Sequence, residues 1–281
     1  MKGSTMRESR ISGIVGITAL VALTIVNVFV VANLSLNSLR PNSAIIRTPL
    51  GFDGISFGNY PVALDFGNLA VGIINGCLIS GFTIFALLLS GALGAYALTF
   101  IDLPRGFRTS VKSAISLGYF IPQASVLITT FLTLRFFRMS NTYAGIVFVY
   151  CFLYMPITMI ILTGYLKNIP KTIVEASMID GANHLVIFGR IVMPMSKSVL
   201  VTITILIFLW TYNDFLWPLI LMARPSKRTI AVALTMFYDD RQQDFGLLSA
   251  AVCISLIPIM TVYLLLKDKI MSGMSAGSVK E

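Results

Sequence analysis

Residues 175–194 read EASMIDGANHLVIFGRIVMP and form a polar, helix-prone segment in a chain that is otherwise strongly apolar. Long apolar stretches lie on both sides of this segment. A simple turn is enough to join two membrane helices, whereas this segment has the composition to build helices of its own. We therefore interpret it as a docking element on which a partner outside the membrane acts.

The first half of the segment carries the signals of a short capped helix. Pro170 ends the preceding apolar stretch, and Thr172 and Glu175 have the spacing of a capping box. Gly181 is placed to end the helix, because glycine adopts the left-handed conformation without a Cβ clash. The apolar side chains available for packing are Ile173, Val174, Ala176 and Ile179.

The second half of the segment predicts another short helix, and Pro194 marks its junction with the next apolar stretch. Two interpretations of this helix–glycine–helix unit are open: a docking loop, and an amphipathic connector that rests on the lipid surface. The periodicity favours the docking loop. The apolar residues at helical spacing on one face are Leu185, Phe188, Ile191 and Val192.

The rest of the chain has the composition of an all-α membrane protein. Of its 281 residues, 56% are hydrophobic and 12% are charged, and the apolar residues occur in long blocks. Six blocks are long enough to cross a bilayer as helices, although glycines and polar residues interrupt the second and third. The predicted spans, which together place the transmembrane domain in residues 11–266, are 11–34, 74–98, 111–134, 144–165, 198–222 and 247–266.

The distribution of Lys and Arg predicts the orientation. If the amino terminus is cytoplasmic, 13 of the 21 Lys and Arg residues fall in inside segments and 8 in outside segments. The predicted cytoplasmic parts are then residues 1–10, 166–197 and 267–281. Outside, residues 35–67 predict turns and a short strand. Residues 223–245 carry both charge signs, so they fit either a contact with a soluble partner or a solvated loop.

No catalytic or metal site is expected. Cys77, Cys151 and Cys253 lie far apart in apolar segments, so we interpret them as small buried hydrophobes. His184 is the single histidine and is predicted to be a polar surface residue. The sequence has no Gly-x-x-x-x-Gly-Lys-Ser/Thr motif, so this chain is not an ATPase. We expect no cofactor and no nucleic-acid partner, because the positive-inside rule accounts for the net charge of +9.

A few polar residues fall at membrane depth, where they need a cavity or a partner. Gln123 lies in the third span, and Asn213 and Asp214 lie in the fifth. These three are candidates for the translocation path. Asn75, in the second span, is another polar residue at membrane depth. Each side chain can contact a solute or bond a neighbouring helix, and we favour the helix contact. The prolines that can kink the spans are Pro122, Pro156 and Pro258.

The docking segment resembles the EAA loop of ABC importer permeases. That family has Glu-Ala-Ala, three residues, Gly, nine residues, Ile, one residue and Leu-Pro. The spacing matches throughout, with Ser177 in place of the second alanine and Met193 in place of leucine. A pattern of this length is specific. The residues that carry the match are Glu175, Ala176, Ser177, Gly181, Ile191 and Pro194.

Further segments resemble the carbohydrate branch of these permeases, and in particular the maltose-type G subunit. The resemblance implies a type I ABC importer permease fold in a bacterial-type inner membrane. It also implies four kinds of protein in the complex: this subunit, a second permease subunit, two ATPase subunits and an extracytoplasmic solute-binding protein. The EAA loop would then couple ATPase closure to the membrane helices. The further matching segments are residues 59–60, 141–143, 212–219 and 273–280.

Two other classes remain as alternatives. A self-contained secondary transporter or channel predicts inverted repeats and several ionisable groups within the membrane. No clear repeat is visible, and Asp214 is the single acidic residue well inside a predicted span. A membrane-embedded enzyme requires a nucleophile–base pair or a metal cluster, and the sequence shows neither.

Overall fold

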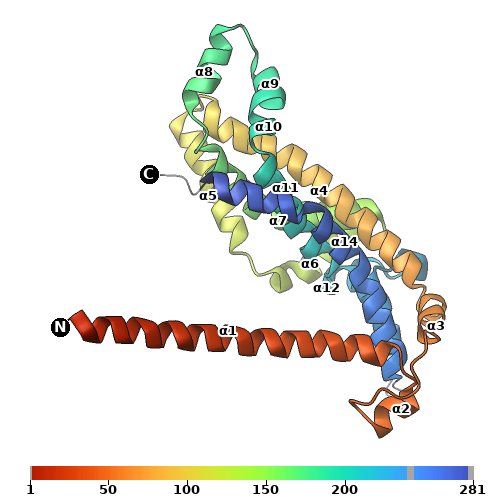
Figure 1. The fold of residues 1–281 in the computed structure, drawn as a ribbon. Helices are drawn as coiled ribbons and strands as arrows, with labels where there is room; N and C mark the ends of the chain where they lie inside the picture. The colour runs from red at the N-terminus through yellow and green to blue at the C-terminus, as the bar shows by residue number, and fades with distance from the viewer. Residues whose placement is uncertain (1, 239–243, 278–281) are drawn as a thin grey trace. The chain divides into compact units, whose positions relative to one another are not determined.

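The computed structural model describes residues 2–238 and 244–277, and every regular element in these residues is a helix. The prediction of an all-α protein is confirmed. The chain divides into two compact units, Met1–Leu69 with Met236–Ile254, and Ala70–Thr235 with Ser255–Glu281. Figure 1 shows the helices with their labels.

The first unit contains α1 (Lys2–Ser38), α2 (Asn42–Arg47), α3 (Asn59–Phe66) and the beginning of α14 (Phe245–Gly277). The most apolar part of α1 lies within Val15–Ser38 and is exposed, as expected of a helix whose side chains face lipid. Asn59 ties the start of α3 to the end of α1, because its amide donates to the carbonyl oxygens of Ser38 and Arg40 at 3.0 and 2.9 Å.

Arg40 organises the turn between α1 and α3. Its side chain is 0% exposed, and its guanidinium donates five hydrogen bonds, four of them to main-chain carbonyl oxygens. These carbonyls belong to Ala44, Thr48, Pro49 and Asp53. The predicted short strand in residues 35–67 is wrong, since two short helices form here and no strand occurs among the described residues of this segment. A guanidinium satisfies the turn carbonyls that a strand would have paired in a ladder.

Arg40→Lys is expected to loosen this turn, because an ammonium group has three donors and lacks the fixed fork of a guanidinium. Losing part of the network makes local opening easier, so chymotrypsin should cut after the exposed Phe52 and Phe57 about fivefold faster. The matched control is Arg47→Lys on the exposed surface of α2. Equal cleavage rates in the two variants would contradict the role of Arg40.

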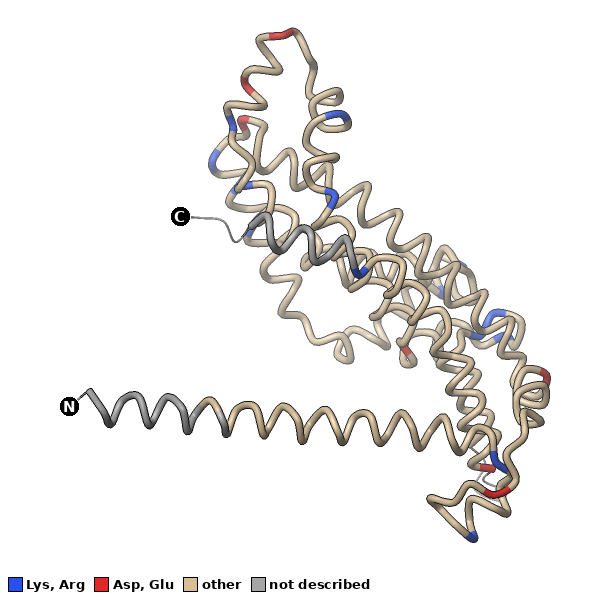
Figure 2. The backbone as a smooth tube through the Cα atoms, viewed as in Figure 1, with Lys and Arg blue, Asp and Glu red and all other residues tan. Residues whose placement is uncertain are grey.

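The second unit contains most of the membrane-type helices. Among the described residues, four helices are unbroken and apolar enough to cross a membrane: Val15–Ser38, Leu69–Phe100, Tyr143–Leu166 and Phe245–Lys267. Two bent pairs also qualify, Arg105–Tyr119 with Gln123–Phe136 at 94° and His184–Met195 with Lys197–Tyr212 at 76°. Six spans result when each bent pair is counted as one. Neither α4 (Leu69–Phe100) nor α7 (Tyr143–Leu166) carries a charged residue (Figure 2).

The glycines of α4 mark its contact with α7 and leave the helix unbroken. A Cβ added to Gly91 would lie 2.9 Å from the Thr158 side chain, and one added to Gly94 would lie 2.9 Å from Met159. Small residues let two membrane helices approach closely. The glycines that interrupt the apolar pattern of the second predicted span therefore do not interrupt the helix, since α4 continues for 32 residues.

The predicted third and fifth spans are broken helices. In the third, α5 (Arg105–Tyr119) stops before Pro122, and a 3₁₀ turn (Gln123–Val126) leads into α6 (Leu127–Phe136). In the fifth, α11 (Lys197–Tyr212) and α12 (Leu216–Leu221) are separated by residues 213–215. Pro156 and Pro258 lie inside α7 and α14, and both helices continue past them. Of the three prolines predicted to kink spans, Pro122 is therefore the one that lies at a helix break.

The segment after α12 belongs to the second unit as far as Thr235 and is packed within it. It forms a 3₁₀ turn (Pro225–Lys227), α13 (Ile230–Ala233) and a second 3₁₀ turn (Leu234–Phe237), and Ile230, Val232 and Ala233 are buried. Asn75 fixes it, since its amide donates to the carbonyl oxygens of Ser226 and Arg228 and accepts from the Tyr143 hydroxyl. A fully solvated loop is thus excluded for this part. Three of the charged residues of segment 223–245, Asp239, Asp240 and Arg241, lie outside the described residues.

The three cysteines are unpaired and half-buried, so the prediction of small buried hydrophobes is met only in part. Each lies on a membrane-type helix, where part of the side chain faces outward from the packed interior.

Candidate functional site

The docking segment forms a helical loop, residues 171–195, that joins α7 to α11. It consists of α8 (Lys171–Ile179), α9 (His184–Ile187), a π turn (Phe188–Val192) and α10 (Met193–Met195). The predicted capping box is wrong. Helix α8 begins directly after Pro170 without a side-chain cap, so Thr172 is already inside the first turn. A capping side chain must precede the first helical residue.

Gly181 ends α8 as predicted. Its φ is +85°, and its amide donates to the Met178 carbonyl while the Ala182 amide donates to the Ser177 carbonyl. These two bonds are those of a Schellman motif, in which glycine takes the left-handed position. Asn183 then caps α9 by accepting from the Val186 amide at 2.9 Å. The predicted helix–glycine–helix arrangement is present.

In the second half of the docking segment, the buried face of the helix differs from the predicted face. Leu185 is 74% exposed, while Ile187 and Val192 are buried. The π turn (Phe188–Val192) places about one more residue in the turn than an α-helix, so Ile187 and Val192, five residues apart, lie on the same side. Residues at regular α spacing cannot all remain on one side across such a turn.

Two tyrosines tie the helical loop to membrane-type helices. The Tyr96 hydroxyl of α4 lies 3.0 Å from His184 Nδ1, and the Tyr96 ring makes edge contacts with the rings of His184 and Phe188. The Tyr165 hydroxyl at the end of α7 donates to the Met195 carbonyl at 3.0 Å. His184 is exposed, as predicted for a surface residue, but the prediction missed its bond to Tyr96.

The predicted docking residues lie mainly on the exposed side of the helical loop. Glu175, Ala176, Gly181 and Pro194 are exposed, whereas Ser177 and Ile191 are half-buried. The Ser177 hydroxyl donates to the Ile173 carbonyl of its own helix at 2.7 Å. Two large apolar side chains flank the glycine turn in the open, Ile179 at 87% and Leu185 at 74% exposure. Exposed apolar side chains that are surrounded by a rim of polar residues mark an interaction site.

The translocation-path candidates lie at the two helix breaks. Asp214 lies between α11 and α12, where its carboxylate accepts from the Tyr150 hydroxyl at 2.7 Å and from the Leu216 amide at 3.1 Å. Asn213 is exposed and donates to Leu209 of its own helix. Gln123 begins the 3₁₀ turn at the other break. Asp214 therefore bonds to Tyr150 of α7, whereas among the described residues Asn213 bonds only within its own helix and makes no contact of this kind.

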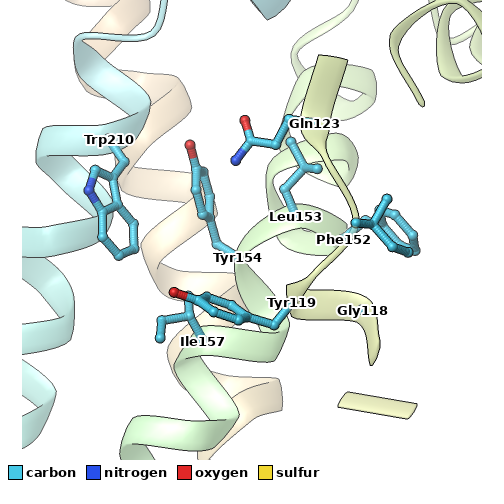
Figure 3. Close-up of a pocket in the computed structure, with 9 residues that line it drawn as sticks. Gly118, Tyr119, Gln123, Phe152, Leu153, Tyr154, Ile157 and Trp210 are labelled. Atoms are coloured by element: carbon cyan, nitrogen blue, oxygen red, sulfur yellow. The ribbon is translucent and has the colours of Figure 1, made fainter. Parts of the chain in front are cut away.

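An aromatic pocket lies beside α7, with a volume of about 240 Å³. Tyr154 and Trp210 stack there with ring centroids 5.4 Å apart and planes inclined at 26°. Figure 3 shows Gln123 and Tyr119 turned toward the same space, while Phe152 points away. These aromatics were not among the residues predicted from the sequence. The lining includes Tyr119, Gln123, Leu153, Tyr154, Ile157 and Trp210.

Comparison with known proteins decides the family. Residues 84–275, more than half of the chain, match the family described as the binding-protein-dependent transport system inner membrane component. The chain belongs to this family. The permease is 30% identical to the melibiose/raffinose/stachyose import permease protein MelC of Bacillus subtilis, over 80% of this chain and 82% of MelC.

Two further comparisons agree with this assignment. The permease is 27% identical to the trehalose transport system permease protein SugB of Mycobacterium tuberculosis, over 86% of this chain and 89% of SugB. Its fold matches a chain of a bacterial ABC transporter that imports the acidic polysaccharide alginate, with a TM-score of 0.81, 22% identity and coverage of 93% and 97%. The type I ABC importer permease fold is thus confirmed.

Proposed function

We propose that this permease is one of two membrane subunits of an ATP-driven sugar importer, and that its helical loop receives a partner ATPase. The observation that carries the proposal is the exposed Gly181 turn, with Glu175 and Ala176 open on α8 and apolar side chains on both sides. Small residues allow a helix to enter a groove on another protein closely. The remaining partners are a second permease subunit, a second ATPase subunit and an extracytoplasmic solute-binding protein.

The contacts of the helical loop support a coupling role. A force on the loop reaches α4 through Tyr96 and α7 through Tyr165, and it reaches α11 through the 76° bend after α10. Packed elements move as units when one of them is displaced. On this proposal, ATPase closure reorients these helices and alternates access to the path between them. Both termini and the helical loop are cytoplasmic, and the protein resides in a bacterial-type inner membrane.

The proposed substrate class is a sugar or an oligosaccharide. The relatives MelC and SugB are named for the transport of melibiose, raffinose, stachyose and trehalose. The test is uptake of radiolabelled melibiose, raffinose and trehalose by cells that carry the complete transporter, with and without this subunit. Uptake should require the subunit and stop when ATP is depleted. Uptake that continues without ATP and stops with a proton uncoupler would favour a secondary transporter.

Tyr96→Phe is expected to slow uptake by about twofold to fivefold. The variant keeps the ring contacts with Phe188 and loses the hydrogen bond to His184, and a bond of this kind contributes about 0.5–1.5 kcal/mol. The coupling between ATPase and transport should weaken as well, so more ATP is hydrolysed per sugar. Both quantities are measured in proteoliposomes. Tyr263→Phe on the exposed part of α14 is the control and should match wild type.

A further inference from the structure

The aromatic pocket lies where two membrane-type helices are interrupted. The break after α5 brings Gln123 to it, and Trp210 comes from the last turn of α11 before the second break. Between them α7 supplies Tyr154 (Figure 3). Irregular backbone at membrane depth is tolerated where it is buried in protein or lines a cavity. In secondary transporters, solute sites are typically built at such discontinuous helices.

A row of three aromatic rings, Tyr150, Tyr154 and Trp210, leads to this pocket. Tyr150 and Tyr154 lie one helical turn apart on α7, with centroids at 5.9 Å, and Tyr154 stacks on Trp210 at 5.4 Å. The Tyr150 hydroxyl donates to the Asp214 carboxylate, which fixes the far end of this row. Trp210 remains 38% exposed at the near end. A flat indole is thus held in place beside open space.

Polar groups share that space with the indole. Figure 3 shows the Gln123 amide and the Tyr154 hydroxyl on the same side of the pocket, and the Tyr119 hydroxyl points toward Ile157. A neighbouring cavity on α7 provides the contrast. It has a volume of about 410 Å³, and aliphatic, aromatic and sulfur-containing side chains such as Ile115, Phe148 and Met155 line it. That cavity suits a lipid chain, whereas an amide and hydroxyls suit a hydroxylated solute.

A sugar ring has the complementary chemistry. A pyranose presents a face of C–H groups, which packs on an aromatic ring, and a rim of hydroxyls, which exchange hydrogen bonds with an amide or a phenol. Binding sites combine apolar walls with a few placed polar groups in this way. The pocket volume of about 240 Å³ suits a single ring and is too small for an oligosaccharide.

We propose that the aromatic pocket binds one pyranose ring of the transported sugar during passage, with the ring face on Trp210 and its hydroxyls on Gln123. This inference rests on the proposed sugar importer function and adds a site in this subunit. Tyr154 stacks on the Trp210 indole and holds it in place. Asp214 acts as a positioning residue, since it bonds Tyr150, whose ring contacts Tyr154. The site is a passing point on the path, since capture from the medium belongs to the solute-binding protein.

The first test is uptake kinetics in cells with the complete transporter, using radiolabelled melibiose or trehalose. Trp210→Ala should lower the maximal rate about tenfold, Gln123→Leu should lower it about threefold, and Trp210→Phe should keep about half of it. KM should change less than about twofold, because the solute-binding protein sets it. Phe148→Ala, which removes an exposed ring of α7 that does not line the aromatic pocket, is the matched control and should behave as wild type.

The second test detects the sugar in the pocket directly. In a variant without Cys77, Cys151 and Cys253, a cysteine is placed at Gln123 or, as the control, at the exposed Gly106, which does not line the pocket. A water-soluble maleimide then labels the complete transporter in proteoliposomes under turnover. Melibiose or trehalose should slow labelling at position 123 at least about threefold and leave labelling at position 106 unchanged, and an equal concentration of sorbitol should protect neither.

The outcomes separate the two proposals. Normal uptake by Trp210→Ala and Gln123→Leu, or labelling at position 123 that sugar does not slow, overturns the pocket while the importer function stands. If the wild-type transporter imports none of the sugars tested, the proposed function and the pocket both fail. Slower uptake together with sugar-specific protection supports the pocket, and the protection assay needs no transport by the pocket variants to be informative.

Discussion

Replacing Gly181 with leucine is expected to lower ATP-driven uptake at least about tenfold while the permease remains in the membrane at normal amounts. Gly181 has a φ of +85°, and an L-residue in the left-handed conformation costs about 1–2 kcal/mol. An added Cβ would meet no atom of this chain within 4 Å. The leucine side chain therefore points into open space, where we propose that the ATPase lies, and it blocks the contact.

Two companion variants separate backbone strain from blocked docking. Asparagine tolerates the left-handed conformation, so Gly181→Asn should fold with little strain and still impair uptake through its bulk. Gly106→Leu is the matched control, since an added Cβ at this exposed glycine on α5 also meets nothing within 4 Å. Uptake is normalised to the permease content of the membrane. Wild-type uptake by both Gly181 variants would rule out a close ATPase contact at this turn.

Asp214→Ala is expected to produce the second large loss, in both stability and uptake. The carboxylate accepts from Tyr150, which is 0% exposed, and from the Leu216 amide at the start of α12. A buried hydroxyl left without a partner costs about 1–3 kcal/mol. We expect a lower unfolding temperature in detergent and at least about tenfold less uptake, since 1.4 kcal/mol corresponds to tenfold.

A double-mutant cycle assigns this effect to the Tyr150 contact. Tyr150→Phe removes the hydroxyl, so Asp214→Ala should cost less in that background than in wild type, with a coupling of about 1–3 kcal/mol. Asn213→Ala is the neighbouring control, because Asn213 is exposed and bonds its own helix. It should lose less than about twofold. An equal loss for Asn213→Ala and Asp214→Ala would show that the break matters and the carboxylate does not.

The main features of the fold were predictable because they depend on long or specific patterns. Apolar blocks predicted the membrane-type helices, and the Gly181 position predicted the end of α8. The positions of the helix breaks were harder to predict. Pro122, Pro156 and Pro258 look alike in the sequence, yet helices continue through the last two. Whether a proline ends a helix depends on which neighbours satisfy the freed carbonyl groups, and this is a property of the packed structure.

The candidate sites were partly predictable for the same reason. Asp214 stood out because a carboxylate at membrane depth requires a partner. Its partner Tyr150, together with Tyr154, is one of many aromatics in an apolar stretch, where lipid-facing and cavity-facing rings look the same. The four-residue spacing of these tyrosines places both on one face of α7 and was the available signal. The π turn left no such signal, because residues 188–192 fit an α-helix equally well.

The Arg40 turn has a consequence for how this protein can diversify. Four of the five acceptors that hold the turn are main-chain oxygens, which every residue type supplies. The outward side chains of residues 41–58 can therefore be exchanged widely while the backbone keeps its course. One buried guanidinium thus leaves the surface around it open to change, and selection or engineering can refit this loop to a new contact without rebuilding the helices beneath it.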